Sequence, residues 1–116
     1  MSRIIYVAGP YTGATAWDRE RNIRNAEETC LALWKAGVPA VCVHTIARHF
    51  FGIVPEETAI EIDNVILDRC DAVMLVVNWP FSKGTLAEID RAESQGKPVF
   101  QCQQLDECIE WAKAAP

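Results

Sequence analysis

Asp63 occupies a position at which a carboxylate is difficult to explain by surface solvation. With about 100° of rotation per residue along a helix, several apolar residues fall within about 60° of it. They are Ala59, Ile60, Ile66, Leu67 and Cys70. A carboxylate in the middle of an apolar stripe is costly to bury without a partner. Two interpretations stay open: Asp63 is a buried cap or an arginine's partner, or its carboxylate faces a functional site.

A second group of polar and aromatic residues follows an apolar run at residues 72–77. Ser82 precedes a helical pattern, where it either caps the helix or contacts a ligand. Glu88 lies about one turn into that helix, where a surface glutamate is the commoner finding. Trp79 either stacks on a base or covers the edge of a sheet. The segment therefore offers a hydroxyl, a carboxylate and an aromatic ring, and each also has a purely structural explanation.

The first loop, Gly9-Pro10-Tyr11-Thr12-Gly13, also follows an apolar run. Glycine allows a backbone to approach a ligand closely and to adopt positive φ. The loop amides could cradle a phosphate at the start of the next helix, or the loop is a tight turn. It does not contain the G-x-G-x-x-G pattern, which disfavours a dinucleotide site.

The elements that must position these residues alternate along the chain. Apolar runs rich in β-branched residues predict buried strands at residues 4–8, 39–43, 72–77 and 98–100. Helical spacing predicts helices at residues 17–36, 55–69, 84–95 and 105–114. Residues 44–54 fit neither pattern, and a short helix or a lid are both open there.

This alternation predicts a single α/β domain over residues 1–116. We expect a Rossmann-like (flavodoxin-like) three-layer sandwich, with a four- to five-stranded, mainly parallel sheet and right-handed crossovers. Ligands bind beyond the carboxyl ends of the strands in such sheets. The loop at residues 9–13, His44 and residues 78–88 all follow predicted strands, so we expect them to surround one site.

Composition narrows the classes of partner. The net charge of −5 argues against a nucleic-acid polymer, which requires a basic face, but leaves a single nucleotide open. The longest apolar run, residues 72–77, is too short to span a membrane, and no secretory signal is recognisable. Five cysteines without a CxxC pattern favour free thiols and a cytoplasmic location. His44 and His49 lack companion ligands, so we expect neither a metal nor another cofactor.

Three blocks of sequence stand out when they are taken together. They are Ile5-Tyr6-Val7-Ala8-Gly9-Pro10-Tyr11, then Asp63 with Asp71-Ala72, and then Ser82-x-Gly84-Thr85-x-x-Glu88-Ile89 with Gly96-Lys97-Pro98-Val99. In this order they resemble the nucleoside 2-deoxyribosyltransferase-like superfamily, and most closely a small branch found in bacterial and phage genomes. This superfamily includes the transferases and the nucleoside 5′-monophosphate N-glycosidases.

The resemblance implies a role for each matching residue. Glu88 matches the nucleophile that attacks the anomeric carbon, and Tyr6 matches the tyrosine that holds this nucleophile. Asp63 matches the acid that protonates or binds the leaving base. Ser82 matches the serine that binds the 5′-phosphate in the monophosphate hydrolases, where the plain transferases have an acidic residue. We therefore expect an N-glycosidase or N-deoxyribosyltransferase acting on a nucleoside 5′-monophosphate or a nucleoside.

The expected site has a catalytic part and a substrate-binding part. Glu88, Asp63 and Tyr6 form the catalytic part. The expected substrate-binding residues are Gly9, Pro10, Tyr11, Thr12, Gly13, His44, Trp79, Ser82, Gly84 and Thr85. A binding module of the same fold, which recognises a nucleotide or a nucleotide-derived signal without turnover, is the alternative. The base, the sugar and the choice between hydrolysis and transfer stay open.

We also expect a homodimer or a higher homo-oligomer. Four Trp and four Phe are many large apolar side chains for a chain of 116 residues, and an interface between subunits would bury some of them. The resemblance implies the same, because members of the superfamily complete each site with a residue of a neighbouring subunit.

Overall fold

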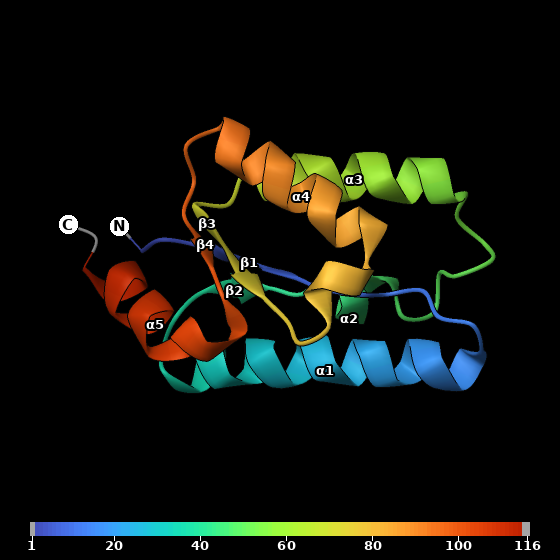
Figure 1. Cartoon of the computed structure of the whole chain (residues 1–116), viewed down its shortest axis with the longest axis horizontal. Helices are drawn as coiled ribbons and strands as arrows, with labels where there is room; N and C mark the ends of the chain where they lie inside the picture. The colour runs from blue at the N-terminus through green and yellow to red at the C-terminus, as the bar shows by residue number, and fades with distance from the viewer. Residues whose placement is uncertain (1, 115–116) are drawn as a thin grey trace.

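A four-stranded parallel sheet lies between two layers of helices in the computed structural model, which describes residues 2–114 (Figure 1). The strands are β1 (Ile5–Ala8), β2 (Ala40–Val41), β3 (Ala72–Leu75) and β4 (Val99–Phe100). The α-helices are α1 (Ala16–Lys35), α2 (Val43–Ala47), α3 (Glu56–Asp68), α4 (Lys83–Ser94) and α5 (Leu105–Lys113). Two short 3₁₀ helices are η1 (Trp79–Phe81) and η2 (Cys102–Gln104).

The strand order is β2-β1-β3-β4, and every neighbouring pair is parallel. The central pair is in register from Ile5 opposite Ala72 to Ala8 opposite Leu75. The chain moves from β1 outward to β2 and then returns past β1 to β3, so the topology changes direction between β1 and β3. The loops that follow these two strands therefore meet at the switch point, where parallel α/β sheets bind ligands.

Alternate residues of the central strands enter two different cores, because successive side chains of a strand point to opposite faces. Ile5 and Val7 pack toward α1 and α5, in a core that contains Leu33 and Cys108. Tyr6 and Ala8 pack on the other face, with Leu67 at the end of α3 and Ala92 of α4. Figure 1 shows these layers, with α3 and α4 on one side of the sheet and α1 and α5 on the other. The position of Tyr6 in β1 thus assigns it to the face covered by α3 and α4.

The ends of the long helices follow local signals in the sequence. Thr15 caps α1, because its hydroxyl accepts a hydrogen bond from the Asp18 amide at 3.1 Å. Gly37 follows the other end of α1 with φ of +79°, a conformation that side chains with a Cβ rarely adopt. Ser82 caps α4 and accepts from the Thr85 amide at 3.2 Å.

The predicted fold class is confirmed: the sheet has four strands and all are parallel. The second strand is shorter than predicted, because the chain leaves the sheet after Val41 and Val43 begins α2. β2 is an edge strand whose only neighbour is β1, and just two residues pair there. The third strand likewise ends at Leu75 rather than at residue 77. The unassigned stretch at residues 44–54 holds most of α2, followed by turns.

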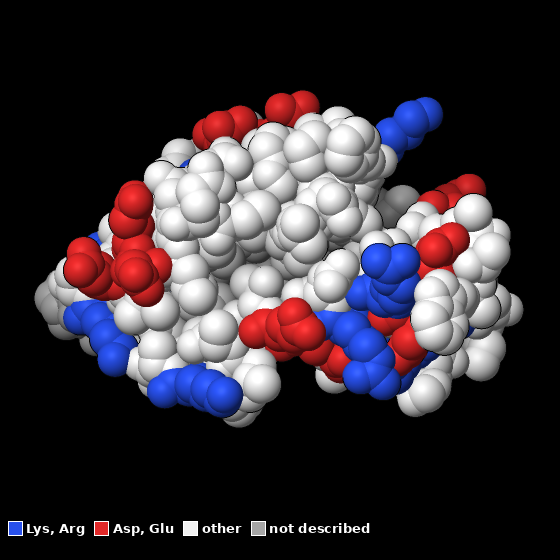
Figure 2. Space-filling model, turned by 60° about the horizontal axis from the view of Figure 1, so that its bottom comes forward, with Lys and Arg blue, Asp and Glu red and all other residues white. Residues whose placement is uncertain are grey.

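The surface combines charged margins with uncharged areas. On the face in Figure 2, acidic and basic side chains gather at the edges, while the middle is uncharged and hollowed. Large apolar side chains that are exposed include Trp17, Trp34 and Phe81, the last at 87%. Within residues 2–114, no helix is both long and apolar enough to cross a membrane. All five cysteines are free thiols.

Candidate active site

Glu88 lies in the second turn of α4 and is only partly exposed. The hydroxyl of Tyr6, from the middle of β1, donates a hydrogen bond to Glu88 Oε2. Tyr6 is fully buried, so its hydroxyl is a fixed donor at this position. A residue that resembles a surface glutamate in the sequence is thus held by a buried tyrosine from a distant strand.

The protonation of this pair is shifted by its surroundings. Burial raises the pKa of Glu88 to about 7; the hydrogen bond from Tyr6 opposes this rise, and the nearby charge of Asp63 adds to it. Burial and the adjacent Glu88 carboxylate hold the pKa of Tyr6 well above its ordinary value, so Tyr6 remains a neutral donor. A pKa in this range suits a carboxyl group that takes part in acid–base chemistry, and the ionised form of Glu88 can act as a nucleophile.

Asp63 is the second carboxyl of this cluster and comes from the middle of α3. It is partly buried, and burial raises its pKa to about 6. Among residues 2–114 it has no salt-bridge partner and no hydrogen bond, so no arginine pair or cap explains it there. Its apolar neighbours Leu67 and Cys70 are buried as predicted, whereas Ile60 is 51% exposed.

The three groups come from three elements that cover one face of the sheet. Asp63 lies close enough to Tyr6 and Glu88 to raise the pKa of both. Two carboxyl groups with raised pKa values and one neutral donor therefore share a partly buried site. Because Glu88 has the higher pKa, a singly protonated pair carries its proton mainly on Glu88, and its minor form, with the proton on Asp63, supplies the nucleophile and the proton donor together.

The first loop is shaped by contacts within the protein. A Cβ at Gly9 would lie 2.6 Å from the Cβ of Val76, so glycine is required for packing against the chain after β3. Asn22 of α1 donates to the carbonyl of Thr12 at 3.1 Å and to that of Tyr11 at 3.4 Å. Neither Gly9 nor Gly13 adopts positive φ, contrary to one reason for expecting glycine there.

The start of α1 is a poor phosphate site. Thr15 already accepts from the Asp18 amide, and its hydroxyl donates to the Asp18 carboxylate at 3.0 Å. The carboxylate places negative charge where a bound phosphate would need positive charge. A Cβ at Gly13 would lie 2.6 Å from the Cβ of Asp18, so this loop end is also packed by the protein itself.

His44, in α2, links the first loop to the segment after β2. Its Nε2 lies 3.0 Å from the carbonyl oxygens of both Gly9 and Pro10, which assigns the ring proton to this nitrogen. Burial lowers the pKa of His44, so the ring is neutral at neutral pH. Its Nδ1 is buried and has no hydrogen-bond partner in the described part of the chain. The ring also meets Tyr11 edge-on at 5.7 Å, so His44 orders the first loop.

The start of α4 brings together the three residues expected there. Ser82 Oγ accepts hydrogen bonds from the amide and the hydroxyl of Thr85, the latter at 2.9 Å. Thr85 is buried, and a Cβ at Gly84 would meet only Ser82 Oγ, at 3.9 Å. The cap is thus a real structural role of Ser82. Its own hydroxyl hydrogen is not used by these bonds, so Ser82 can still donate to a ligand.

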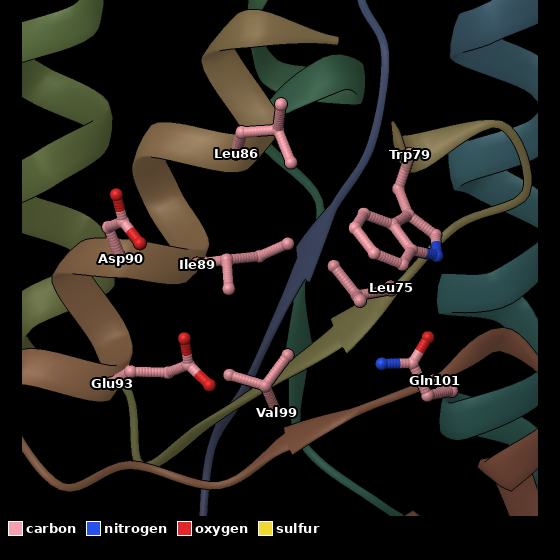
Figure 3. Close-up of a pocket in the computed structure, with 8 residues that line it drawn as sticks. All are labelled: Leu75, Trp79, Leu86, Ile89, Asp90, Glu93, Val99 and Gln101. Atoms are coloured by element: carbon pink, nitrogen blue, oxygen red, sulfur yellow. The ribbon is translucent and has the colours of Figure 1, made fainter. Parts of the chain in front are cut away.

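Trp79 does not join the carboxyl groups. It lines an open groove of about 530 Å³ between α4 and β4, together with Leu75, Leu86, Ile89, Asp90, Glu93, Val99 and Gln101 (Figure 3). Leu86 and Glu88 are separated by about 200° around the helix, so the groove lies against the opposite side of α4 from Glu88. The groove and the carboxyl cluster are therefore two distinct regions.

Two residues near the first loop were not predicted from the sequence. Arg19 of α1 places its guanidinium 4.2 Å from the centre of the Phe51 ring, and the Phe51 ring lies 6.2 Å from that of Tyr11. A usable signal was present, because Arg19 precedes the apolar row Ile23, Ala26 and Leu33 by one turn. It is a charged residue at the head of an apolar stripe, as Asp63 is a charged residue within one.

The described residues contain no group of three or more His, Cys, Asp or Glu side chains that could hold a metal ion. A family model described as "Domain of unknown function (DUF7768)" matches residues 3–102. This range contains every residue of the candidate site. No protein of curated function matches the chain.

Proposed function

We propose that this chain, which belongs to the family described as Domain of unknown function (DUF7768), cleaves N-glycosidic bonds. The proposed substrate is a nucleoside 5′-monophosphate or a nucleoside. The observation that carries this proposal is the partly buried Glu88, held by the hydroxyl of Tyr6 and near a second, unpaired carboxyl at Asp63. The resemblance to the nucleoside 2-deoxyribosyltransferase-like superfamily supports the same roles for the same three residues.

The first step forms a covalent glycosyl–enzyme ester. The Glu88 carboxylate attacks the anomeric carbon through an oxocarbenium-like transition state, and the bond from that carbon to the base nitrogen breaks. Asp63, in its protonated form, gives its proton to the leaving base. Tyr6 donates to Glu88 and orients the attacking carboxylate.

The second step releases the sugar. Water attacks the anomeric carbon of the ester, the ionised Asp63 accepts the proton of that water, and Glu88 leaves as a carboxylate. If a second base attacks instead of water, its nitrogen forms the new glycosidic bond, the ionised Asp63 accepts the proton of that nitrogen, Glu88 leaves as a carboxylate, and the reaction is a transfer. Both outcomes use the same residues, so the site supports hydrolysis and base exchange equally.

The phosphate of a nucleotide substrate is assigned to the start of α4. The free hydroxyl hydrogen of Ser82 and the amides of Lys83 and Gly84 are donors there, and no acidic residue occupies the first turn of the helix. Ser82 and Glu88 are six residues apart, about 9 Å along the helix axis, which a sugar phosphate can bridge. The start of α1 is less suitable because Asp18 occupies it.

A homodimer is the proposed assembly. Trp17, Trp34 and Phe81 are 74%, 66% and 87% exposed, and burial between subunits would remove this apolar surface from water. Light scattering at micromolar concentration should give twice the mass of the chain. A monomer under these conditions would contradict the assembly, though not the chemistry.

The proposed activity is tested with a panel of ribo- and deoxyribonucleosides and their 5′-monophosphates. The protein is incubated with each, and free base is measured by chromatography, with the Glu88→Gln variant as the control for a contaminating enzyme. We expect base release by the wild-type protein and almost none by the variant. Binding without any release of base would contradict the enzymatic proposal and favour a nucleotide-binding module of the same fold.

A further inference from the structure

Arg19 differs from the other partly buried basic side chains of the described chain. Arg3, Arg48, Arg91 and Lys97 all donate hydrogen bonds to carbonyl or carboxylate oxygens of the protein. Arg19 is also partly buried, but within residues 2–114 it has neither a hydrogen bond nor a salt bridge. Its Nε is buried without any partner. Leaving guanidinium donors unused in a partly buried place costs free energy, which a ligand that accepts hydrogen bonds would recover.

The surroundings of Arg19 connect it to the acid of the proposed reaction. Its guanidinium lies over the ring of Phe51 at 4.2 Å, which fixes the plane in which its donors are presented. The hydroxyl of Tyr11 lies within the electrostatic field of both Arg19 and Asp63. This hydroxyl donates to the carbonyl of Ala47 at 3.0 Å, so it is already in use. The ring of Phe51, 6.2 Å from that of Tyr11, therefore places Arg19 beside the first loop, and Arg19 has free donors there.

We propose that Arg19 recognises the leaving base through its oxygen, and that among purines the site prefers a 6-oxopurine to a 6-aminopurine. This inference rests on the proposed function, in which Asp63 contacts the base. A guanidinium has donors and no acceptor, so it matches a base edge that presents two acceptors, such as the O6 and N7 of a 6-oxopurine. The 6-amino group of adenine presents a donor beside N7 instead, which the guanidinium cannot accept. Pyrimidines give no such contrast, because cytosine also presents two acceptors, O2 and N3.

A phosphate is a poorer ligand for Arg19 than a neutral base. Glu20 follows Arg19 directly and lies within its electrostatic field. Asp18 precedes it and carries a second carboxylate in the first turn of α1. These charges repel a dianionic phosphate, whereas they act weakly on an uncharged base. The phosphate is then left to the start of α4, where the first turn has no acidic residue.

The test uses pairs of ligands that differ mainly by an oxo or an amino group. Inosine is compared with adenosine and guanosine with 2,6-diaminopurine riboside, each with and without a 5′-phosphate and as the ribo and deoxyribo form. Dissociation constants are measured by calorimetry on Glu88→Gln protein, in which the ligand is not consumed. Arg19→Gln is added to this background, and Arg21→Gln, an exposed residue of the same helix, is the matched control.

We expect the Glu88→Gln protein to bind the oxo member of a pair about tenfold or more tightly. Arg19→Gln should bring this ratio close to one, and Arg21→Gln should leave it unchanged. Arg19→Lys keeps the charge but loses the planar fork, so it should reduce the ratio as well. If a thermal unfolding scan shows that the Arg19→Gln variant is unfolded, the Arg19→Lys variant is used for the comparison instead.

Three results would overturn the proposal. The first is an oxo-to-amino ratio that Arg19→Gln leaves unchanged. The second is a loss confined to the 5′-phosphates and equal for all bases, which would assign Arg19 to the phosphate. The third is no binding of any of these ligands. Release of base by the wild-type protein is scored separately, so an Arg19-dependent preference without turnover would contradict the proposed function and leave the recognition of the base standing.

Discussion

The two long sides of α4 present carboxylates in opposite settings. On one side, Glu88 is partly buried and receives a hydrogen bond from the buried Tyr6. On the other, Asp90 and Glu93 are exposed at the rim of the groove that Trp79 lines. The groove is the more obvious hollow (Figure 3), with an apolar floor and a volume of about 530 Å³.

This difference shows that the more visible hollow and the more reactive groups need not coincide. The groove has volume, but its acidic residues are solvated and have no fixed donor in the described chain. The Glu88 side has a desolvated carboxyl group, a fixed hydrogen-bond donor and a second carboxyl group, Asp63, whose charge raises the pKa of Glu88. Desolvation and charge coupling are what tune an acid for catalysis, so the proposed chemistry belongs to the Glu88 side.

The largest expected effect comes from removing one carboxylate on each side of α4 and comparing the two variants. Glu88→Gln keeps the shape of the side chain and removes the nucleophile, so base release should fall by at least about 10³-fold while ligand binding survives. Glu93→Gln makes the same chemical change on the groove side and should leave the rate within about twofold of wild type. The rate is measured by chromatography of free base. An equal loss of rate in the two variants would contradict the assignment of the chemistry to the Glu88 side of α4.

Asp63→Asn should slow base release by about 10²–10⁴-fold, because the amide cannot deliver a proton. The loss should be smaller for bases that leave easily without protonation. Asp90→Asn, on the groove side, is the matched control.

The pH profile sharpens the Asp63 prediction. The wild-type reaction needs one proton on the pair formed by Asp63 and Glu88, whose pKa values lie at about 6 and about 7. The rate should therefore peak between these values and fall on both sides. Asp63→Asn should lose the alkaline fall, because no acid remains to be ionised. A wild-type rate that stays flat from pH 5 to pH 9 would exclude this pair as the catalytic groups.

The substitution Glu88→Gln, which should abolish activity, should at the same time raise the stability of the fold at high pH. The pKa of Glu88 is raised from its ordinary value of 4.5 to about 7, so its stabilisation is complete at low pH and is lost as pH rises through 7. At pH 8, Glu88→Gln should be more stable than wild type by on the order of 1–3 kcal/mol, and at pH 4 this gain should vanish. Urea unfolding at the two pH values measures it. An equal difference at both would mean that Glu88 is not desolvated.

The smallest effect is expected at the start of α4. Ser82→Ala should weaken binding of 5′-monophosphates about tenfold and leave nucleosides nearly unchanged, because one charge-assisted hydrogen bond is lost. Losing the cap should also cost about 1 kcal/mol of folding stability. Affinities of the two ligand classes are compared by calorimetry. If binding of nucleosides and of 5′-monophosphates is weakened equally, Ser82 caps α4 and does not bind the phosphate.

Much of the fold could be predicted because its signals are local. Continuous apolar runs such as residues 72–77 predict buried strands, and Gly37 marks the end of α1 whatever lies around it. The short second strand was less predictable, since it ends where the chain turns into α2 at Val43, although β1 continues to Ala8. The apolar stripe around Asp63 likewise singled out that carboxylate before any partner was known.

The sequence by itself determined the alternation of strands and helices and the anomaly of Asp63, because periodicity and local propensity act between near neighbours. The resemblance implied that Tyr6 holds Glu88, but only the tertiary structure shows the hydrogen bond between these residues, 82 positions apart. It alone decided that Gly9 serves the packing of Val76, and that Arg19 lies over Phe51 with no hydrogen-bond partner among residues 2–114. These facts arise from contacts between distant segments. The physical reason is that desolvation and hydrogen bonding depend on which surfaces the fold brings together, and spacing along one helix does not contain that information.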